Sequence, residues 1–231
     1  MTRNINISRM AALTALFLLI ETALMLFADR PIALWAHGLD TTHHALIDFF
    51  RHITNFGKST WYLWLCGIAT ILCGFLSRAQ SAPPFARRLC AYIGSRALFV
   101  FLTIAVSGIV ADIFKPIIGR ARPVELLRDN LYGFHFFTTA GFAWNSMPSG
   151  HTTTAFALGF SLCALYPRLR PLWLAIAVTL GLSRVMVDAH YVSDVCAGAV
   201  LGSLTVRVFL AYRKLQPWRV IFPIDTNVAN G

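Results

Sequence analysis

The chain has 231 residues, of which 57% are hydrophobic and 13% are charged. Soluble domains carry roughly 25% charged residues, so this composition excludes an ordinary water-soluble domain and favours one membrane-embedded domain. The formal charge is +10, with 20 Lys and Arg residues against 10 Asp and Glu residues. The basic residues punctuate apolar runs, which favours a lipid bilayer as partner and argues against nucleic acid.

Six apolar runs are long enough to cross a bilayer, which takes about 20 residues. They lie at 10–28, 59–77, 93–114, 150–166, 171–188 and 192–212. The predicted fold is all-α, a six-transmembrane helix bundle in a single domain over 1–231, with a core at about 45–213 and a tail at 214–231. The first run lacks a clear cleavage site, so we interpret it as a retained helix and not as a signal peptide.

Basic residues concentrate in segments that six spans place on one side of the membrane. In chain order they are Arg3, Arg9, Arg78, Arg87, Arg88, Arg96, Arg168, Arg170, Arg207, Arg213, Lys214 and Arg219. The positive-inside rule makes that side cytoplasmic, with both termini inside. The external side then holds 29–58, 115–149 and 188–191. In the first of these we expect a wet loop with a short interfacial helix from Ala45 to Phe56.

Other polar residues give weaker signals. His43 and His44 have no carboxylate or cysteine pattern that would complete a metal site. Glu21 lies deep in the first run, where a protonated or hydrogen-bonded packing residue is favoured over a catalytic one. The cysteines are odd in number, form no CxxC and are interpreted as packing residues: Cys66, Cys73, Cys90, Cys163 and Cys196.

Three clusters of chemically active residues fall on the predicted external side. Residues 115–123 read KPIIGRARP, residues 148–151 read PSGH, and residues 183–194 read SRVMVDAHYVSD. They lie far apart in sequence, but six spans bring all three to one membrane face. We therefore expect a single site at the external, periplasmic end of the bundle.

The pattern Lys-x6-Arg-Pro, then Pro-Ser-Gly-His, then Ser-Arg-x5-His-x3-Asp resembles the type 2 phosphatidic acid phosphatase superfamily. The resemblance covers about Ala45 to Arg213, and every motif position is matched. This superfamily contains integral-membrane lipid phosphatases with six helices and soluble relatives such as vanadium haloperoxidases and acid phosphatases. The six apolar runs favour the membrane branch.

The resemblance implies a binding site for the substrate phosphate. Its residues are Lys115, Arg122, Ser149, Gly150 and Arg184. A phosphate monoester needs cations and N–H donors, which guanidinium groups and a helix N-terminus provide. Because Gly150 has no side chain, phosphate can approach the backbone closely.

The resemblance also divides the catalysis between two histidines. His190 resembles the nucleophile that forms a phosphohistidine, and His151 resembles the general acid that then activates water. Asp194 follows His190 by about one helical turn and can accept the other imidazole N–H. No metal and no other cofactor is expected, since protein cations stabilise the charge.

Two charged residues within the motifs stay open. Arg120 could contact the phosphate or a lipid headgroup. Asp188 stands where the family pattern leads us to expect a small or neutral residue. It is either a solvated turn residue or a group that tunes His190 or repels a second anion.

The expected function is hydrolysis of a lipid phosphate or pyrophosphate at the outer face of a bacterial inner membrane. Family substrates there include lipid A, undecaprenyl pyrophosphate, phosphatidylglycerophosphate and phosphatidic acid; residues 124–145 would help to select among them. An aromatic, membrane-facing rim is expected from Phe134, Phe136, Phe137, Phe142 and Trp144. The alternatives are a lipid-to-lipid phosphotransferase and, from another class, a proton-coupled transporter. The oligomeric state stays open.

Overall fold

A computed structural model of the protein describes residues 7–211. The expected tail at 214–231 and the basic residues Arg3, Arg213, Lys214 and Arg219 lie outside this range. The helical elements are α1 (Ile7–Ala23), the π-helical η1 (Leu24–Ala28), α2 (Asp29–Thr42), α3 (His44–Ile53), η2 (Thr54–Gly57), α4 (Ser59–Leu76), α5 (Pro84–Ile118), α6 (Pro123–Asp129), η3 (Gly141–Trp144), α7 (Gly150–Leu165), η4 (Pro167–Leu169), α8 (Arg170–Met186) and α9 (Val192–Ala211). Between residues 7 and 211 no strand forms, which confirms the all-α prediction.

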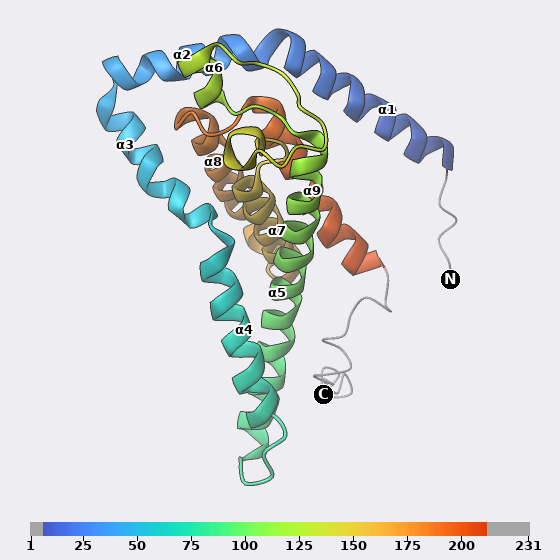
Figure 1. Ribbon diagram of the computed structural model, residues 1–231. Helices are drawn as coiled ribbons and strands as arrows, with labels where there is room; N and C mark the ends of the chain where they lie inside the picture. The colour runs from blue at the N-terminus through green and yellow to red at the C-terminus, as the bar shows by residue number, and fades with distance from the viewer. Residues whose placement is uncertain (1–6, 212–231) are drawn as a thin grey trace.

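Four helices, α5, α7, α8 and α9, make up what we call the bundle (Figure 1). α7 packs against each of the other three. The apolar core of the bundle comes from α5, α7 and α9 and contains Phe99, Val100, Ile104, Ala157, Val206 and Phe209. Burial of these side chains gives the bundle an apolar interior that holds the ends of its helices in register.

Glycines allow α7 and α9 to approach at backbone distance. A Cβ atom on Gly198 would lie 2.6 Å from the carbonyl oxygen of Ser149, and one on Gly202 would lie 2.4 Å from that of Thr153. Two glycines four residues apart on an apolar helix are typical of close helix pairing in membranes. This contact places the start of α9 beside the start of α7.

Residues 7–57 form what we call the N-terminal arm. α1 leaves the upper end of the bundle obliquely, α2 runs across that end and α3 descends beside it (Figure 1). The helix from His44 to Ile53 agrees with the predicted interfacial helix. The rest of the external segment was expected to be a loop, and this is wrong: Asp29–Thr42 is helical and continues from η1.

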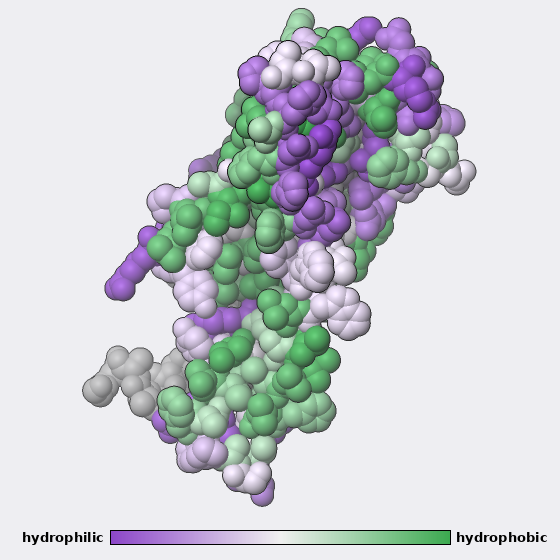
Figure 2. Space-filling view, turned by 90° about the vertical axis from the view of Figure 1, so that its left-hand side faces the viewer, coloured by the Kyte–Doolittle hydropathy of each residue, from purple (hydrophilic) through white to green (hydrophobic). Residues whose placement is uncertain are grey.

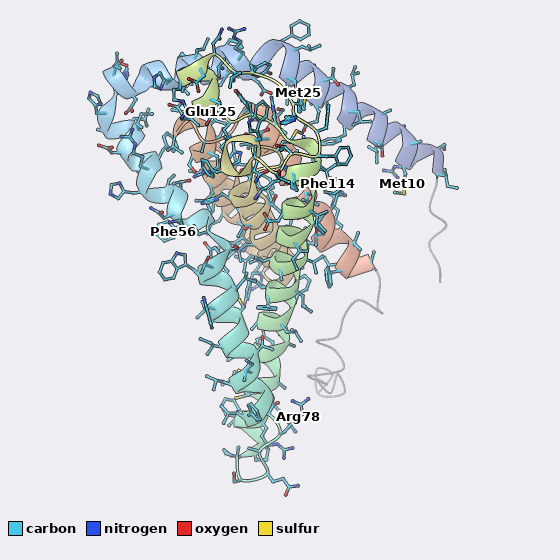
Figure 3. The ribbon with its side chains drawn as sticks, in the orientation of Figure 1. Met10, Met25, Phe56, Arg78, Phe114 and Glu125 are labelled. Carbon is cyan, nitrogen blue, oxygen red and sulfur yellow. The ribbon has the colours of Figure 1, made fainter. Side chains whose placement is uncertain are left out.

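α4 and α5 form a hairpin that extends below the bundle, with Arg78 near its tip (Figures 1 and 3). The expected link between the second and third spans is shorter than predicted. Arg87, Arg88 and Arg96 lie on α5 itself, which begins at Pro84 and not near residue 93. Figure 2, viewed from the side of α2 to α4, shows hydrophilic residues gathered at the upper end and hydrophobic residues over the hairpin.

Five described segments are long and apolar enough to cross a membrane: Ile7–Thr42, His44–Arg78, Pro84–Ile118, Pro167–Met186 and Val192–Ala211. The remaining predicted span corresponds to α7, which has 16 residues and occupies the centre of the bundle. At about 1.5 Å per residue such a helix is shorter than a hydrocarbon core of about 30 Å. The chain is a multi-pass membrane protein.

Candidate active site

Four helix ends of the bundle meet at its upper end. α5 and α8 finish there, and α7 and α9 begin there (Figure 1). Each end carries part of one sequence motif, so the structure brings the three motifs together as their order predicted. The connection from α5 to α7, which includes α6 and η3, also lies at this end of the bundle (Figure 1).

His190 lies between a carboxylate and a guanidinium group. Its side chain is 3% exposed, and its Nδ1 lies 3.6 Å from Oδ2 of Asp194. Its Nε2 lies 3.5 Å from Nη1 of Arg122. Burial lowers the pKa of His190 to about 4, although the adjacent Asp194 acts to raise it. The imidazole is therefore neutral near pH 7, with Nδ1 toward the carboxylate and Nε2 toward the guanidinium group.

Asp194 is held by groups that the sequence analysis did not single out. Its Oδ2 accepts hydrogen bonds from the Ser146 hydroxyl at 2.5 Å and from the backbone N–H of Tyr191 at 2.9 Å. Both donors come from the loops that flank the helix ends. They fix the carboxylate beside His190 even though the His190–Asp194 distance exceeds that of a hydrogen bond.

Backbone carbonyls hold Arg122 in place. Its guanidinium group donates to the carbonyl oxygens of Phe142 at 2.9 Å, Ala189 at 3.1 Å and Asn145 at 3.1 Å. The Phe142 ring covers it, with 3.9 Å between the guanidinium carbon and the ring centroid. Burial lowers the pKa of Arg122. Phe142, one of the residues expected at a membrane-facing rim, is exposed and also stacks on a motif arginine.

The N-terminal arm reaches two motif residues. Arg184 donates from Nη1 to Oγ1 of Thr54 at 2.6 Å, and its buried Nε has no partner within the described range. A Cβ atom on Gly57 would lie 3.0 Å from Cβ and Cδ2 of His151, so a larger residue here would require the His151 side chain to shift. Nothing in the sequence pattern pointed to Thr54 or Gly57, because their partners are remote in sequence.

Lys115 and Ser149 flank the start of α7 in different ways. Nζ of Lys115 lies 3.3 Å from the position that a Cβ atom on Gly150 would occupy, so the ammonium group stands over the helix N-terminus. It also donates to Asp112 at 2.7 Å. Ser149 is fully buried, and its hydroxyl accepts a hydrogen bond from Thr152. Its backbone N–H donates to the carbonyl oxygen of Asp194 at 3.0 Å, which joins α7 to α9.

Arg120 forms a buried ion-pair network instead of a contact with a lipid headgroup. The side chain is 1% exposed and donates at 2.6 Å to Oδ1 of Asp194 and at 2.6 Å to Oδ2 of Asp29. Burial acts to lower the pKa of Arg120, but the two carboxylates raise it overall. No local sequence motif includes Asp29. Its signal was a carboxylate at the end of an apolar run, 91 residues before its partner.

Asp188 is neither a solvated turn residue nor a contact of His190. Its Oδ2 lies 2.7 Å from Nδ1 of His37 on α2, and burial raises the pKa of Asp188. Its φ of 54° is a left-handed conformation in the tight turn between α8 and α9. Both residues line a cavity of about 480 Å³, the outer cavity, together with Arg122, Val124, Leu127, Arg128, Phe142, Val187 and Ala189.

Metal-ligating side chains do not cluster in the described part of the chain. Between residues 7 and 211 there is no group of three or more His, Cys, Asp and Glu residues arranged to hold an ion. His43 and His44 are exposed at the junction of α2 and α3. All five cysteines are free thiols.

Comparison with known proteins gives a consistent result. The family model of the PAP2 superfamily matches residues 96–218. A lipid A 1-phosphatase from Rhizobium johnstonii is 38% identical over 80% of this chain and 75% of its own length. One from Rhizobium etli is 34% identical over 77% of this chain and 74% of its own length.

The fold has a counterpart among solved structures. A transmembrane PAP2-type phosphatidylglycerolphosphate phosphatase from Bacillus subtilis aligns with a TM-score of 0.59 at 22% identity, over 88% of this chain and 95% of that one. At this identity the likeness concerns the fold alone. Taken with the sequence relatives and the matched motifs, it shows that the chain belongs to the PAP2 superfamily, as an integral-membrane lipid phosphatase.

Proposed function

We propose that this protein hydrolyses the 1-phosphate of a lipid A-type glycolipid through a phosphohistidine on His190. The observation that supports this mechanism most is the setting of His190. Asp194 adjoins Nδ1, and Nε2 is directed at Arg122 where four helix ends meet. The substrate is inferred from the two lipid A 1-phosphatases that this chain resembles.

The outer cavity fits a bulky headgroup. Its volume of about 480 Å³ adjoins Arg122, so a phosphate at Arg122 would leave its attached headgroup in this space. Val124, Leu127 and Phe142 give it apolar walls, and His37 and Arg128 give it polar groups. Such a lining suits a sugar, which has apolar faces and a hydroxylated edge.

In the first chemical step, the Nε2 lone pair of His190 forms a bond to phosphorus. The bond between phosphorus and the lipid oxygen breaks, and that oxygen takes a proton from His151. Charge that shifts onto the phosphoryl oxygens is stabilised by Lys115, Arg122, Arg184 and the N–H groups at Gly150. Asp194 stabilises the His190 ring as it becomes positive.

In the second step, His151 takes a proton from a water molecule whose oxygen bonds to phosphorus. The nitrogen–phosphorus bond breaks, its electrons return to His190, and inorganic phosphate leaves. His151 regains the proton that it needs as an acid in the next cycle. The negative charge of a bound phosphate favours protonation of His151.

The site is proposed to face the periplasm, with both termini in the cytoplasm and the chain in the bacterial inner membrane. Basic residues support this orientation. Arg78 lies near the tip of the α4–α5 hairpin (Figure 3), and Arg87 and Arg88 lie at the start of α5 in the same hairpin. The helix ends around His190 lie at the opposite, upper end (Figure 1). Because positive charge is retained on the cytoplasmic side, the opposite end is periplasmic.

The decisive experiment is phosphate release by the full-length protein in detergent, with a chelator present. Lipid A labelled with ³²P at the 1-position would be compared with phosphatidic acid, phosphatidylglycerophosphate and undecaprenyl pyrophosphate. We expect preference for lipid A, and an acid-labile, alkali-stable ³²P-protein adduct that accumulates in His151→Ala. Both release and adduct should be lost in His190→Ala and kept in the control His43→Ala. Full activity in His190→Ala would contradict the mechanism.

Lipid A that is turned over more slowly than the other three substrates would contradict the proposed substrate while leaving the mechanism intact. Addition of an excess of phosphate-free acceptor lipid separates hydrolysis from transfer. A hydrolase keeps releasing inorganic phosphate, whereas a phosphotransferase passes the label to the acceptor.

A further inference from the structure

A continuous buried network joins the N-terminal arm to His190. Asp29 begins α2, and its Oδ2 lies 2.6 Å from Nη2 of Arg120. The other terminal nitrogen of Arg120 lies 2.6 Å from Oδ1 of Asp194. Oδ2 of Asp194 lies 3.6 Å from His190. The order of groups is therefore carboxylate, guanidinium, carboxylate, imidazole.

Ser193 locks Asp29 into this arrangement. Its backbone N–H donates to Oδ1 of Asp29 at 3.0 Å, and its hydroxyl donates to Oδ2 at 2.6 Å. Asp29, Ser193 and Asp194 are at most 1% exposed. Because Ser193 precedes Asp194 directly, the arm contacts α9 immediately beside the carboxylate that adjoins His190.

The charges along the network explain why a second carboxylate matters. Arg120 and Asp194 alone would sum to zero, and the guanidinium group would draw the Asp194 charge away from His190. Asp29 offsets Arg120, so the three groups together carry one negative charge next to the imidazole. Coulombic terms are strong in a site that excludes water, so this difference affects a ring that becomes positive during phosphoryl transfer.

We propose that Asp29 is a positioning residue for the His190 reaction: acting through Arg120, it leaves the Asp194 charge free to stabilise the phosphorylated imidazole. The inference depends on the proposed role of His190 as nucleophile. Asp29 does not contact the reacting atoms. It makes the reaction depend also on α2, which lies outside the region matched by the family model.

Other polar groups around the network are accounted for. Tyr191 and Tyr132 lie against Arg120, with 4.4 Å and 5.9 Å from the guanidinium carbon to their ring centroids. Tyr132 also donates to the carbonyl oxygen of Met25 in η1 at 2.6 Å. Glu21, on the preceding helix, is buried without a hydrogen-bond partner in the described range. Cys196 of α9 is free. Among the described residues, the ion pairs of Arg120 are with Asp29 and Asp194.

The test is Asp29→Asn, which preserves shape and removes one charge. We expect kcat to fall about tenfold, the factor that one pKa unit represents, with KM unchanged. The acid limb of the pH–rate profile should move to lower pH, because protonation of His190 loses a favourable charge. The matched control is Asp48→Asn, which removes an exposed aspartate paired with Arg51 on the same arm and should change neither quantity.

A second pair of variants keeps the test meaningful if Asp29→Asn unfolds. Asp29→Glu and Asp29→Gln have the same size and differ only in charge. We expect Asp29→Glu to keep the acid limb and most of kcat, and Asp29→Gln to lose both to a similar degree. Equal kcat values and equal pH profiles for the two would overturn the proposal, because a purely structural role depends on shape and not on charge.

A double variant tests the route through Arg120. In an Arg120→Gln background, Asp29→Asn should cause much less than its tenfold loss, because the group through which it acts is gone. Full additivity would overturn the proposal. Failure of the parent mechanism is recognised separately, since no ³²P adduct would then form in the His151→Ala protein that carries the native Asp29.

Discussion

The bundle and the N-terminal arm contribute to the site in opposite ways. The bundle helices and the connections between them supply every residue of the three motifs, and apolar packing and glycine contacts at backbone distance hold these helix ends. The arm supplies no motif residue, and much of its apolar surface is exposed. Even so, it contacts the motif region at four places, through Asp29, His37, Thr54 and Gly57.

The difference between the bundle and the arm is that the bundle carries the groups proposed to react with phosphate, whereas the arm carries groups that change the charge and access of those groups. Residues that bind or attack phosphate need rigid positions, and the packed helices of the bundle provide them. Residues that set charge or close the site need only a few directed contacts, which a lightly packed arm can make. Substitutions in the bundle should therefore abolish activity or folding, whereas substitutions in the arm should change rates, pH dependence or selectivity.

The largest effect is expected at Arg184 in the bundle. Arg184→Gln removes a cation proposed to stabilise charge on the phosphoryl oxygens, and such losses reduce kcat by about 10²–10³-fold. Steady-state kinetics with the lipid substrate measure this. Arg168→Gln, an exposed arginine in the turn between α7 and α8, is the control and should retain full activity. A loss of kcat of less than tenfold in Arg184→Gln would show that stabilisation of the phosphoryl oxygens does not depend on Arg184.

The second-largest effect is expected at the contact between α7 and α9. In Gly202→Ala the new methyl group would lie 2.4 Å from a backbone oxygen, so the helices must separate. Overpacking of this kind costs about 1–3 kcal/mol and should lower the melting temperature in detergent. Gly108→Ala provides the comparison, because nothing lies within 4 Å of its Cβ position. Equal melting temperatures for the two variants would contradict the close approach.

The pH dependence should report the burial of His190. Its pKa is lowered from 6.5 to about 4, so kcat/KM should fall with an acid limb near pH 4 and not near pH 6.5. The unfolded chain binds this proton at the higher pH. The free energy of unfolding should therefore fall as the pH drops from about 6.5 to about 4. Below pH 4 this group should cause no further loss of stability. A limb that persists near pH 4 in His190→Gln would assign it to another group.

A smaller effect is expected where the arm meets Arg184. Thr54→Val keeps the side-chain shape and removes the hydrogen bond to Nη1. A hydrogen bond to a charged group contributes about 1.5–3 kcal/mol, but water can replace the partly buried hydroxyl, so we expect only a fivefold loss of kcat/KM, equivalent to about 1 kcal/mol. Thr41→Val on α2, whose hydroxyl bonds only to its own helix, should have no effect.

The smallest effect belongs to Asp188. Because its partner His37 is 54% exposed, Asp188→Asn should change kcat by less than about threefold. If the outer cavity holds a sugar headgroup, KM should rise for lipid A and stay constant for phosphatidic acid. An equal change for both lipids would argue against recognition in this cavity. A shift of the acid limb would instead show that Asp188 acts on His190.

The sequence predicts the bundle helices and, in the arm, the helices α1 and α3, but it predicts neither α2 nor the contacts between the arm and the bundle. α7, α8 and α9 follow apolar runs with clear ends, and their motifs are local in sequence. Residues 29–42 were interpreted as a loop because four of them are Asp, Arg or His; the polar face of α2 was mistaken for a break in the helix. Arg120 was left open because its two partners lie 91 and 74 residues away. A local pattern does not contain such pairings.

The position of Asp29 near the start of the chain has a consequence for membrane insertion. Asp29 is synthesised 91 residues before Arg120. At about 5–20 residues per second this interval lasts roughly 5–18 s. Asp29 lies at the start of α2, at the upper end of the bundle, and burial of its charge there is unfavourable until Arg120 is present. The start of α2 is therefore expected to stay at the interface or beside the insertion machinery until α5 is complete. Its final seating would then follow synthesis of the arginine that it meets.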